Sequence, residues 1–368
     1  MRILNVSAFF ESHSGGIEIV AGQLARALGK RGHESRLAAA ALDPIPQDTD
    51  FTAIPLTATD PLERLLGLPM PVPRAAARRT LQREIMEADA IVVHDALYST
   101  SVLAQRYATK YRKPWLLIQH IGAIPYANPV LRAALKTANR LVTKPMLERA
   151  PQVVFISDTV RRYFDGLNWR SEPKLLFNGV DSALFHPPAE PRETGTHQRK
   201  KILFVGRFVE KKGLPVLREL AVQQPEWDFL LVGSGPIDPV GWQLPNIKLL
   251  GRKNRPELAE IFRNSDALVL PSVGEGFPLV IQEAMATGIP VYCGTESAIA
   301  DPNATRYLTG IEIDLGDPQK TAQQFSQEIE NGPCGPNLSA SAYARATYDW
   351  DANAAWIDQR LTAVCDRA

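Results

Sequence analysis

The sequence predicts an α/β protein with two doubly wound, Rossmann-like domains that face a cleft. Its 368 residues exceed what one hydrophobic core usually organises, so two domains are expected. Short apolar runs alternate with helical segments from end to end, as in βα units that build parallel sheets. A stretch rich in Pro, Thr, Gly and charge, without periodicity, interrupts this alternation at Pro187–Lys200.

The predicted strands are short apolar runs bounded by turn-forming residues. In the first half they are Ile3–Val6, Ile91–Val93, Trp115–Ile118 and Val153–Ile156. In the second half they are Ile202–Val205, Phe229–Val232, Ile247–Leu249, Ala267–Leu270 and Pro290–Tyr292. The predicted helices between them include Ile17–Leu28, Thr80–Glu87, Glu257–Asn264 and Val280–Ala286.

The domain boundaries follow from this alternation. Residues 1–180 are expected to form the first domain and residues 181–345 the second, with a hinge near residues 178–200. Residues 346–368 contain a last helix, Trp350–Val364, which we expect to cross back onto the first domain. Ligands of open α/β sheets bind beyond the carboxyl ends of the strands, so the loops that follow strands should line the cleft.

The composition is that of a soluble globular protein, with 45% apolar and 22% charged residues. The net charge of +1 hides an asymmetry between the halves. Residues 1–185 contain 23 Lys and Arg against 17 Asp and Glu, whereas the remainder contains 18 against 23. A basic first half indicates contact with an anion, which leaves phosphate, nucleic acid and an anionic membrane open.

The cysteines and the first residues bear on location. Cys293, Cys334 and Cys365 are too few and too far apart for a disulfide framework or a zinc site. Residues 1–7 are typical of a buried strand rather than a signal peptide, and no stretch approaches the ~20 apolar residues of a spanning helix. We therefore expect a cytoplasmic protein whose membrane contact is peripheral.

The strongest functional pattern lies in Leu270–Pro290. A strand ends at its first residue, a loop carries Glu275, and Pro278 is expected to be the first residue of the next helix. Glu283 lies two turns further along and would reach another part of an elongated ligand. Carboxylates accept paired hydrogen bonds from neighbouring hydroxyls, so the pair suits a polyhydroxylated ligand. The alternative, a cap charge and a solvated helix face, does not account for the accompanying Gly276 and the closing Gly-Ile-Pro.

This segment resembles the E-x7-E signature of glycosyltransferase family 4. The resemblance implies a GT-B fold and retaining transfer of a sugar from a UDP- or GDP-linked donor. It assigns contacts with the donor sugar to Glu275 and contacts with the nucleotide ribose to Glu283. By the same resemblance, backbone amides around residues 276–279 would hold the sugar or the diphosphate, which makes this stretch donor-binding: Gly276, Phe277, Pro278 and Leu279.

A second segment, Phe204–Leu214, contains Arg207 at the end of a strand and Lys212 before a glycine. A departing diphosphate needs positive charge, which these side chains supply. Without the first segment, an ordinary basic turn would explain them equally well. The segment is similar to the family's G-R-x4-K-G pattern, which implies that Arg207 and Lys212 grip the donor pyrophosphate and are catalytic together with Glu275.

Other loops match the family's donor site more loosely. Gly16 opens a helix after the first strand, in a glycine pair that lacks the full G-x-G-x-x-G pattern. Gly233 and Arg252 follow two strands of the second half, where the family places the nucleotide base. His94 and His120 follow strands of the first half, and the resemblance favours His120 as a catalytic residue that lines the reaction centre. Asp95 is a weaker candidate for orienting an acceptor hydroxyl.

No metal ion or cofactor is expected, because the sugar nucleotide is a substrate. A D-x-D triplet binds a divalent metal in the other large glycosyltransferase fold, and the chain contains two such triplets. Residues 48–50 lie in a Pro-rich loop, and residues 349–351 are placed to cap the last helix. We interpret both as structural.

A row of basic residues recurs every four positions along a predicted helix: Arg132, Lys136, Arg140 and Lys144. One interpretation is a solvated helix face, and the other is an interface with anionic lipid. Because many family members act on lipid-linked acceptors, we expect peripheral contact with the inner face of the membrane. No recognition helix or zinc motif points to nucleic acid.

The sequence thus predicts a retaining, metal-independent glycosyltransferase. It would move a sugar from a nucleotide diphosphate to a hydroxyl of a glycan or lipid-linked acceptor, in cell-surface polysaccharide or glycolipid synthesis. One alternative is a glycosidase that uses Glu275 and Glu283 as acid and base, which would need no phosphate clamp. The other is a non-catalytic protein that binds sugar nucleotides.

Overall fold

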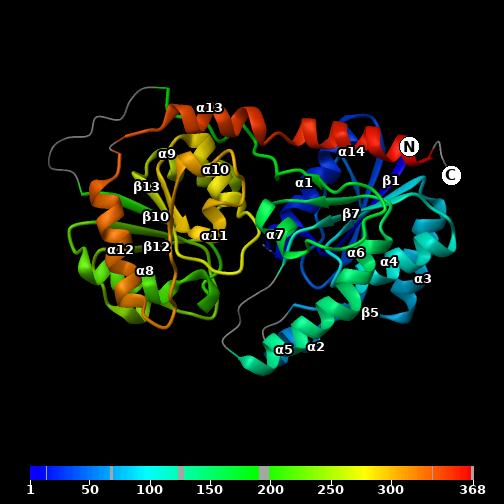
Figure 1. Ribbon diagram of the computed structural model, residues 1–368, viewed down its shortest axis with the longest axis horizontal. Coiled ribbons are helices and arrows are strands. Elements are labelled where there is room, and N and C mark those ends of the chain that lie inside the picture. The colour runs from blue at the N-terminus through cyan, green and yellow to red at the C-terminus, as the bar shows by residue number, and fades with distance from the viewer. Residues whose placement is uncertain (14, 67–68, 123–127, 190–198, 334, 366–368) are drawn as a thin grey trace. The chain divides into compact units, whose positions relative to one another are not determined.

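A computed structural model describes residues 1–368 except 14, 67–68, 123–127, 190–198, 334 and 366–368 (Figure 1). The chain divides into two compact units. The first contains the described residues up to Asn178 and the final segment from Trp350, and the second is Gly179–Asp349. Cys334 and most of Pro187–Lys200 lie outside the described residues.

The first unit is built on a parallel sheet of seven strands in the order β3-β2-β1-β6-β7-β8-β9. The strands are β1 (Arg2–Phe9), β2 (Glu34–Ala40), β3 (Thr52–Leu56), β6 (Ala90–His94), β7 (Trp115–Gln119), β8 (Val153–Phe155) and β9 (Lys174–Leu175). The strand order reverses between β1 and β6, so the loops that follow these two strands meet at the carboxyl edge of the sheet.

Helices cover both faces of this sheet. α1 (Gly16–Lys30) packs against α14 (Trp350–Cys365) on one face, where Ile357 and Leu361 join the core of Ile3 and Leu24 (Figure 1). The other face is covered by α3 (Ala75–Glu87), α4 (Ser99–Lys110) and α6 (Lys144–Arg149). α1 folds as a helix because its apolar residues recur at three- and four-residue spacing, which gives it one continuous buried face.

The second unit has a six-stranded parallel sheet in the order β12-β11-β10-β13-β14-β15. The strands are β10 (Lys201–Val205), β11 (Asp228–Val232), β12 (Ile247–Gly251), β13 (Ala267–Leu270), β14 (Val291–Gly294) and β15 (Leu308–Ile311). The order reverses between β10 and β13, which brings the loops after these strands together.

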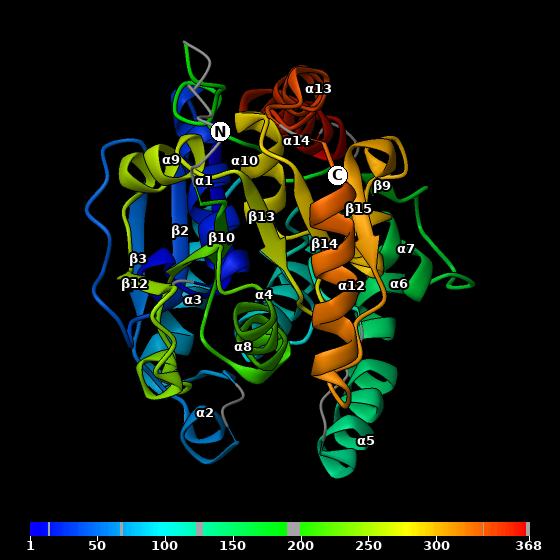
Figure 2. The same ribbon diagram turned by 90° about the vertical axis from the view of Figure 1, so that its left-hand side faces the viewer.

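Five helices of the second unit position its loops. α8 (Leu214–Gln223) and α12 (Pro318–Asn331) pack against each other in front of the sheet (Figure 2). α10 (Leu279–Thr287) contacts both α9 (Arg255–Arg263) and α13 (Leu338–Thr347). α10 is buried along nearly its whole length, from Ile281 to Thr287, so the side chains it carries have fixed surroundings.

Every predicted strand overlaps an observed strand, and the predicted helices also form. β2, β3 and β15 were not predicted, nor were the two-residue strands β4 (Ala58–Thr59), β5 (Val72–Pro73) and β9. β2 has the sequence Glu-Ser-Arg-Leu-Ala-Ala-Ala, which contains no β-branched residue and is more typical of a helix. Pro278 is not the first helical residue: it is the N-cap, with a non-helical ψ of 131°, and the helix begins at Leu279.

Candidate functional site

The loops after β10 and β13 meet in the second unit because their strands are neighbours in the sheet. The backbone N–H of Val273 donates to the carbonyl of Lys211 over 2.9 Å. Lys212 Nζ lies 3.0 Å from Glu275 Oε1, and Lys211 Nζ lies 3.8 Å from the same oxygen. The two motifs recognised separately in the sequence therefore form one site.

Two glycines allow these loops to approach each other. Gly213 has a φ of +72°, and a Cβ there would lie 2.1 Å from the carbonyl oxygen of Pro271. Gly233 has a φ of +140°, and a Cβ there would lie 1.9 Å from the carbonyl oxygen of Gly206. No side chain fits either contact, so both positions require glycine. Gly233 thus has a structural reason for its presence, whatever it binds.

The Glu275 carboxylate is held as an anion. Burial raises the pKa of this carboxyl, but the charges of Lys212 and Lys211 outweigh it and leave the pKa below its ordinary value. Its Oε1 is buried and, apart from its contacts with the two lysines, has no partner among the described residues. A buried, ionised oxygen with unused acceptor capacity is suited to a hydroxyl donor on a ligand.

Arg207 and Arg252 lie on exposed loops of the same unit. Arg207 follows β10 directly, and among the described residues its guanidinium has no ion-pair partner. Arg252 follows β12, and its Nε donates to Ser234 Oγ over 2.8 Å, which links it to the loop of Gly233. The backbone N–H of Phe208 also donates to the carbonyl of Ser234, so the three loops are tied together.

Glu283 differs from the solvated helix residue considered above. It lies in α10 with an exposed fraction of 3%, and its Oε1 is 3.1 Å from Nη1 of Arg255, the first residue of α9. Burial raises the pKa of the Glu283 carboxyl, and Arg255 offsets only part of this effect. The Arg255 guanidinium lies over the Phe185 ring, 5.1 Å from its centroid. Arg255 therefore orients the Glu283 carboxylate, and the Phe185 ring in turn supports the Arg255 guanidinium.

The donor-motif loop is also supported by Tyr348, near the end of the second unit. The buried Phe277 ring meets the Tyr348 ring edge to face, with centroids 5.7 Å apart. The hydroxyls of Tyr343 and Tyr348 donate to Oδ2 of the buried Asp301 over 2.7 and 2.8 Å. Tyr348 also accepts a backbone hydrogen bond from Val180, 2.9 Å away. The segment where the chain enters this unit, at Val180, is thus attached to the segment where it leaves, at Tyr348.

In the first unit, the structure brings the two candidate histidines together. His94 Nδ1 is 3.3 Å from His120 Nε2, and both rings are buried. Burial lowers the pKa of His94 to about 3, and burial together with His94 lowers the pKa of His120, so both rings are neutral at physiological pH. Their strands β6 and β7 are neighbours, so this pairing could have been anticipated from the predicted sheet.

Asp95 organises the loops beneath these histidines. Its Oδ2 accepts hydrogen bonds from Gln119 Nε2 and from the backbone N–H groups of His120 and Ile121, over 3.1 to 3.3 Å. Burial raises the pKa of the Asp95 carboxyl to about 6 despite these bonds. The residue has a φ of +60°, which is uncommon outside glycine. With its carboxylate engaged in this way, Asp95 has a clear structural role.

The remaining predicted residues have simpler surroundings. Gly16 begins α1, and a Cβ there would meet nothing within 4 Å, so packing does not demand a glycine. Asp48 pairs with Arg26, and Asp349 directly precedes α14. Within the part of the chain that the structure describes, no three His, Cys, Asp or Glu residues gather where they could hold a metal ion.

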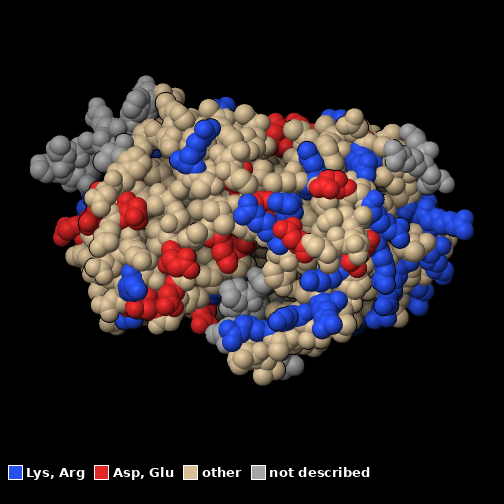
Figure 3. All heavy atoms as spheres, in the orientation of Figure 1, with Lys and Arg blue, Asp and Glu red and all other residues tan. Residues whose placement is uncertain are grey.

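The predicted basic row lies on α5 (Pro129–Ala138) and the turns that follow it. Arg132, Lys136 and Arg140 are exposed, and Figure 3 shows basic side chains in a row along α5. A π-helical turn, Asn139–Thr143, changes the register of the row before α6. α5 has no buried residue, and Val130 and Leu141 are 75% and 69% exposed. The helix thus presents both charge and apolar surface to solvent.

Sequence reasoning missed Arg255, Tyr348 and Asp301. None of them belongs to a recognisable spacing pattern, because each reaches the site through packing of elements distant in sequence. Among the described residues, no helix is both long and apolar enough to cross a membrane.

Two family models match the chain. One, described as Glycosyltransferase Family 4, matches residues 14–184, and the other, Glycosyl transferases group 1, matches residues 199–331. Together they account for most of the sequence and for both units.

Curated relatives agree with these matches. An uncharacterised glycosyltransferase of Methanocaldococcus jannaschii is 25% identical over 256 residues, 68% of each chain. A phosphatidyl-myo-inositol mannosyltransferase of Propionibacterium freudenreichii is 25% identical over 272 residues, 71% of this chain and 67% of that protein. Other relatives, D-inositol 3-phosphate glycosyltransferases among them, are matched over about half of their length.

Solved structures show the same fold along the whole chain. Sucrose-phosphate synthase of Thermosynechococcus elongatus has a TM-score of 0.73 at 21% identity, with both chains fully covered. Anabaena HepE, solved in complex with UDP and glucose, has a TM-score of 0.71 at 18% identity and covers 99% of this chain and 100% of its own. At these sequence identities, the similarity concerns the fold alone.

Proposed function

The chain belongs to glycosyltransferase family 4 and has the GT-B fold, and we propose that it transfers a sugar from a nucleotide diphosphate to an acceptor hydroxyl with retention of configuration and without a metal ion. The observation that carries this proposal is the contact between Lys212 and Glu275. It places a cation for phosphate beside an ionised carboxylate that suits a sugar hydroxyl, on two loops that neighbouring strands bring together.

The roles of the site residues follow from their surroundings. Arg207, which is exposed and has no anionic partner in the described chain, and Lys212 stabilise the departing diphosphate. The backbone N–H groups of Gly276, Phe277 and Leu279, at the start of α10, add partial positive charge. These groups supply the charge that a divalent ion would otherwise provide, which is why we propose a reaction without metal.

The two carboxylates bind different parts of the donor. Glu275 positions the sugar, because its buried oxygen has unused acceptor capacity. Glu283 binds the ribose hydroxyls through the carboxylate that Arg255 orients. Gly233 and Arg252 belong to loops beside the nucleotide. HepE was solved with UDP, which makes a UDP-linked donor the first to test, and GDP-linked donors the second.

In the first unit we assign His120 to the reaction centre and a supporting role to its neighbour His94. Gly16 lies at the start of α1, where a ligand can approach the backbone without displacing any side chain. The loop of Gly16 follows β1 and that of His94 follows β6, and these strands flank the reversal of strand order.

The acceptor is a glycan or a lipid-linked molecule, and the enzyme acts in cell-surface polysaccharide or glycolipid synthesis. The name of the P. freudenreichii relative indicates a lipid acceptor for that protein. The exposed α5 and the π-helical turn after it carry the basic row together with exposed Val130 and Leu141, which supports peripheral binding to an anionic membrane.

A screen of UDP- and GDP-sugars for released nucleotide tests the reaction. The wild type should turn over one of them at the same rate in EDTA and in Mg²⁺, and the Glu275→Ala variant should lose most of that turnover. NMR of the product gives the anomeric configuration, which should match that of the donor. Near-complete turnover by Glu275→Ala would contradict the placement of the donor.

The two alternatives give different results in the same experiments. A glycosidase would hydrolyse glycosides in the absence of nucleotide. A non-catalytic binding protein would show calorimetric binding of UDP or GDP but no nucleotide release with any acceptor. Failure to bind either nucleotide would contradict both the proposal and the non-catalytic alternative, and would favour a glycosidase.

A further inference from the structure

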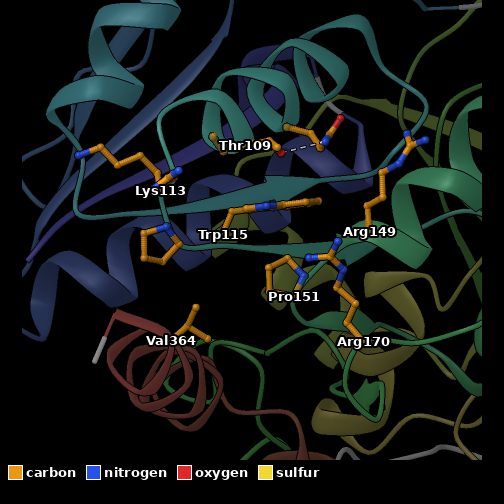
Figure 4. A pocket seen from close by; sticks show the side chains of 11 residues that line it. Thr109, Lys113, Trp115, Arg149, Pro151, Arg170 and Val364 are labelled. Atoms are coloured by element: carbon orange, nitrogen blue, oxygen red, sulfur yellow. Dashed lines mark hydrogen bonds between the residues drawn. The ribbon is translucent and has the colours of Figure 1, made fainter. Parts of the chain in front are cut away.

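A second concave site lies in the first unit, away from the loops described above. It is a cavity of about 270 Å³ at the start of β7, between the loop after α4, the end of α6 and the last turn of α14 (Figure 4). Trp115, the first residue of β7, lines it. His120 follows the other end of the same strand, which at about 3.3 Å per residue is roughly 15 Å away.

The cavity is surrounded by positive charge. Arg112, Lys113, Arg149 and Arg170 line it, and no Asp or Glu does. The ammonium of Lys113 donates to the carbonyl of Ala88 over 2.8 Å. The three guanidiniums have no carboxylate partner among the residues that the structure describes. Three guanidiniums without carboxylate partners, gathered around one concave site, give it the positive charge that binding of an anionic group requires.

The floor of the cavity is apolar. Trp115 is only 4% exposed, and Pro114, Pro151 and Val364 complete the lining. In Figure 4, Arg149 and Arg170 lie at one end of the Trp115 ring, and Lys113 extends away at the other. Trp115 belongs to the hydrophobic core of the unit and gives the cavity a rigid apolar floor. An apolar floor with guanidiniums at its edge suits a ligand that has both an organic part and an anionic group.

The backbone of this cavity is also unusual. Arg112 has a φ of +52°, in the left-handed region that non-glycine residues seldom occupy. Its N–H donates to the carbonyl of Thr109 over 3.3 Å, so the turn after α4 is closed around it. The N–H of Lys113 donates to the carbonyl of Ala108 over 2.9 Å, so the left-handed residue ends α4 and fixes the backbone from which the arginine lines the cavity.

We propose that this cavity binds the phosphoryl group of a small phosphate ester. A phosphate monoester carries −1.5 to −2 charges near neutral pH and accepts hydrogen bonds from several guanidinium forks at once. The volume lies near the lower end of the range for small-molecule pockets, which fits one phosphate with a compact organic part. The phosphoryl group belongs either to a soluble ester or to a phospholipid headgroup. The proposal does not depend on the donor site.

Calorimetry with glycerol 3-phosphate and with inorganic phosphate tests the soluble source. Sedimentation with phosphatidylglycerol vesicles, against phosphatidylcholine vesicles, tests the lipid source. In the double variant Arg149→Gln/Arg170→Gln, the affinity for the bound probe should fall about tenfold or more, because hydrogen bonds to a charged group are lost.

The matched control is Arg79→Gln/Arg106→Gln, which removes the same charge from exposed positions of the same unit outside the cavity. This control variant should bind the probe with an affinity within about twofold of the wild-type value. Nucleotide release and thermal unfolding of both double variants should equal those of the wild type. Saturable binding that only the cavity variant loses supports the proposal. Binding of glycerol 3-phosphate identifies a soluble source, and binding of phosphatidylglycerol vesicles identifies a lipid source. Absence of binding to every probe, or equal losses in both variants, overturns it.

Discussion

Arg255 Nη1 and Glu283 Oε1 form a partly buried ion pair of 3.1 Å at the point where α9 meets α10. The carboxylate is almost fully buried, and the guanidinium stacks on Phe185. One member of the expected donor pair therefore depends on a residue that no sequence motif identifies. The pair favours the ionised form of Glu283 against the effect of burial and engages one of its two carboxylate oxygens.

Replacing Arg255 with Met should weaken donor binding more than catalysis. Without the guanidinium, burial is unopposed and the pKa of Glu283 rises further, so a neutral carboxyl replaces a stronger hydrogen-bond acceptor. We expect the donor KM to rise about tenfold or more, with a smaller change in kcat, and the KM to improve as the pH is raised. Arg255→Lys should recover part of the loss.

The control for this experiment is Arg218→Met, an exposed arginine on α8 whose partner is Glu219. It should leave the KM and its pH profile unchanged. An unaltered pH profile in Arg255→Met, in an enzyme that Glu283→Gln does impair, would show that Arg255 does not orient the carboxylate. If Glu283→Gln has no effect either, the assignment of Glu283 to the donor is wrong.

Lys212 and Lys211 differ in their distance to Glu275, and this difference predicts unequal effects. Lys212→Met should reduce kcat about a hundredfold or more, because a group that stabilises the leaving diphosphate is lost. Lys211→Met should reduce kcat far less, because Lys211 Nζ lies 3.8 Å from Glu275 Oε1 whereas Lys212 Nζ lies 3.0 Å from it. Steady-state nucleotide release measures both, and equal losses would argue against a specific role for Lys212.

The buried Asp95 should make the free energy of unfolding depend on pH. The folded chain binds this proton more tightly than the unfolded chain, because the pKa rises from 3.8 to about 6 on folding. The stabilisation that the tighter binding of this proton gives the folded chain is therefore fully present below pH 3.8. It is lost as the pH rises through about 6. The difference in unfolding free energy between wild type and Asp95→Asn should shrink by about 3 kcal/mol across this window, at ~1.4 kcal/mol per unit.

Urea denaturation at a series of pH values measures this difference. His94, whose low pKa gives the opposite slope, is present in both proteins, so its contribution cancels. A constant difference across the window would mean that Asp95 is ionised throughout.

Tyr348 should support the donor loop through its ring rather than its hydroxyl. Tyr348→Phe removes one hydrogen bond to Asp301 and should cost about 1–3 kcal/mol of stability with little change in the donor KM. Tyr348→Ala also removes the packing on Phe277 and should raise the KM in addition. Thermal unfolding and KM, measured on both variants, separate the two effects. A KM that rises equally in both would attribute the support to the hydroxyl.

The sequence was sufficient to predict the two-unit α/β fold and the strands that carry the motifs. Their loops follow strands at the reversal of strand order, so the meeting of Lys212 and Glu275 is a consequence of topology. β2 was missed because its alanines are ambiguous between helix and strand, and the sheet decides.

The supports of the site could not be predicted in the same way. Arg255 is separated from Glu283 by 28 residues, and Tyr348 from Phe277 by a longer segment. Their contacts depend on how α9, α10 and α13 pack, and that packing is set by the shapes of many side chains rather than by a periodic pattern. The cavity at Trp115 could not be predicted for the same reason, because the arginines that line it come from separate segments of the chain.

The discontinuous first unit has a consequence for synthesis of the protein. Ala354, Ile357 and Leu361 of α14 belong to the same core as Ile3, Leu24 and Val92, yet they leave the ribosome after the whole second unit. Until then α1 covers this face of the first sheet without α14, and the apolar surface that α14 buries stays exposed to aggregation. The domain that is translated first is therefore the last to complete its core.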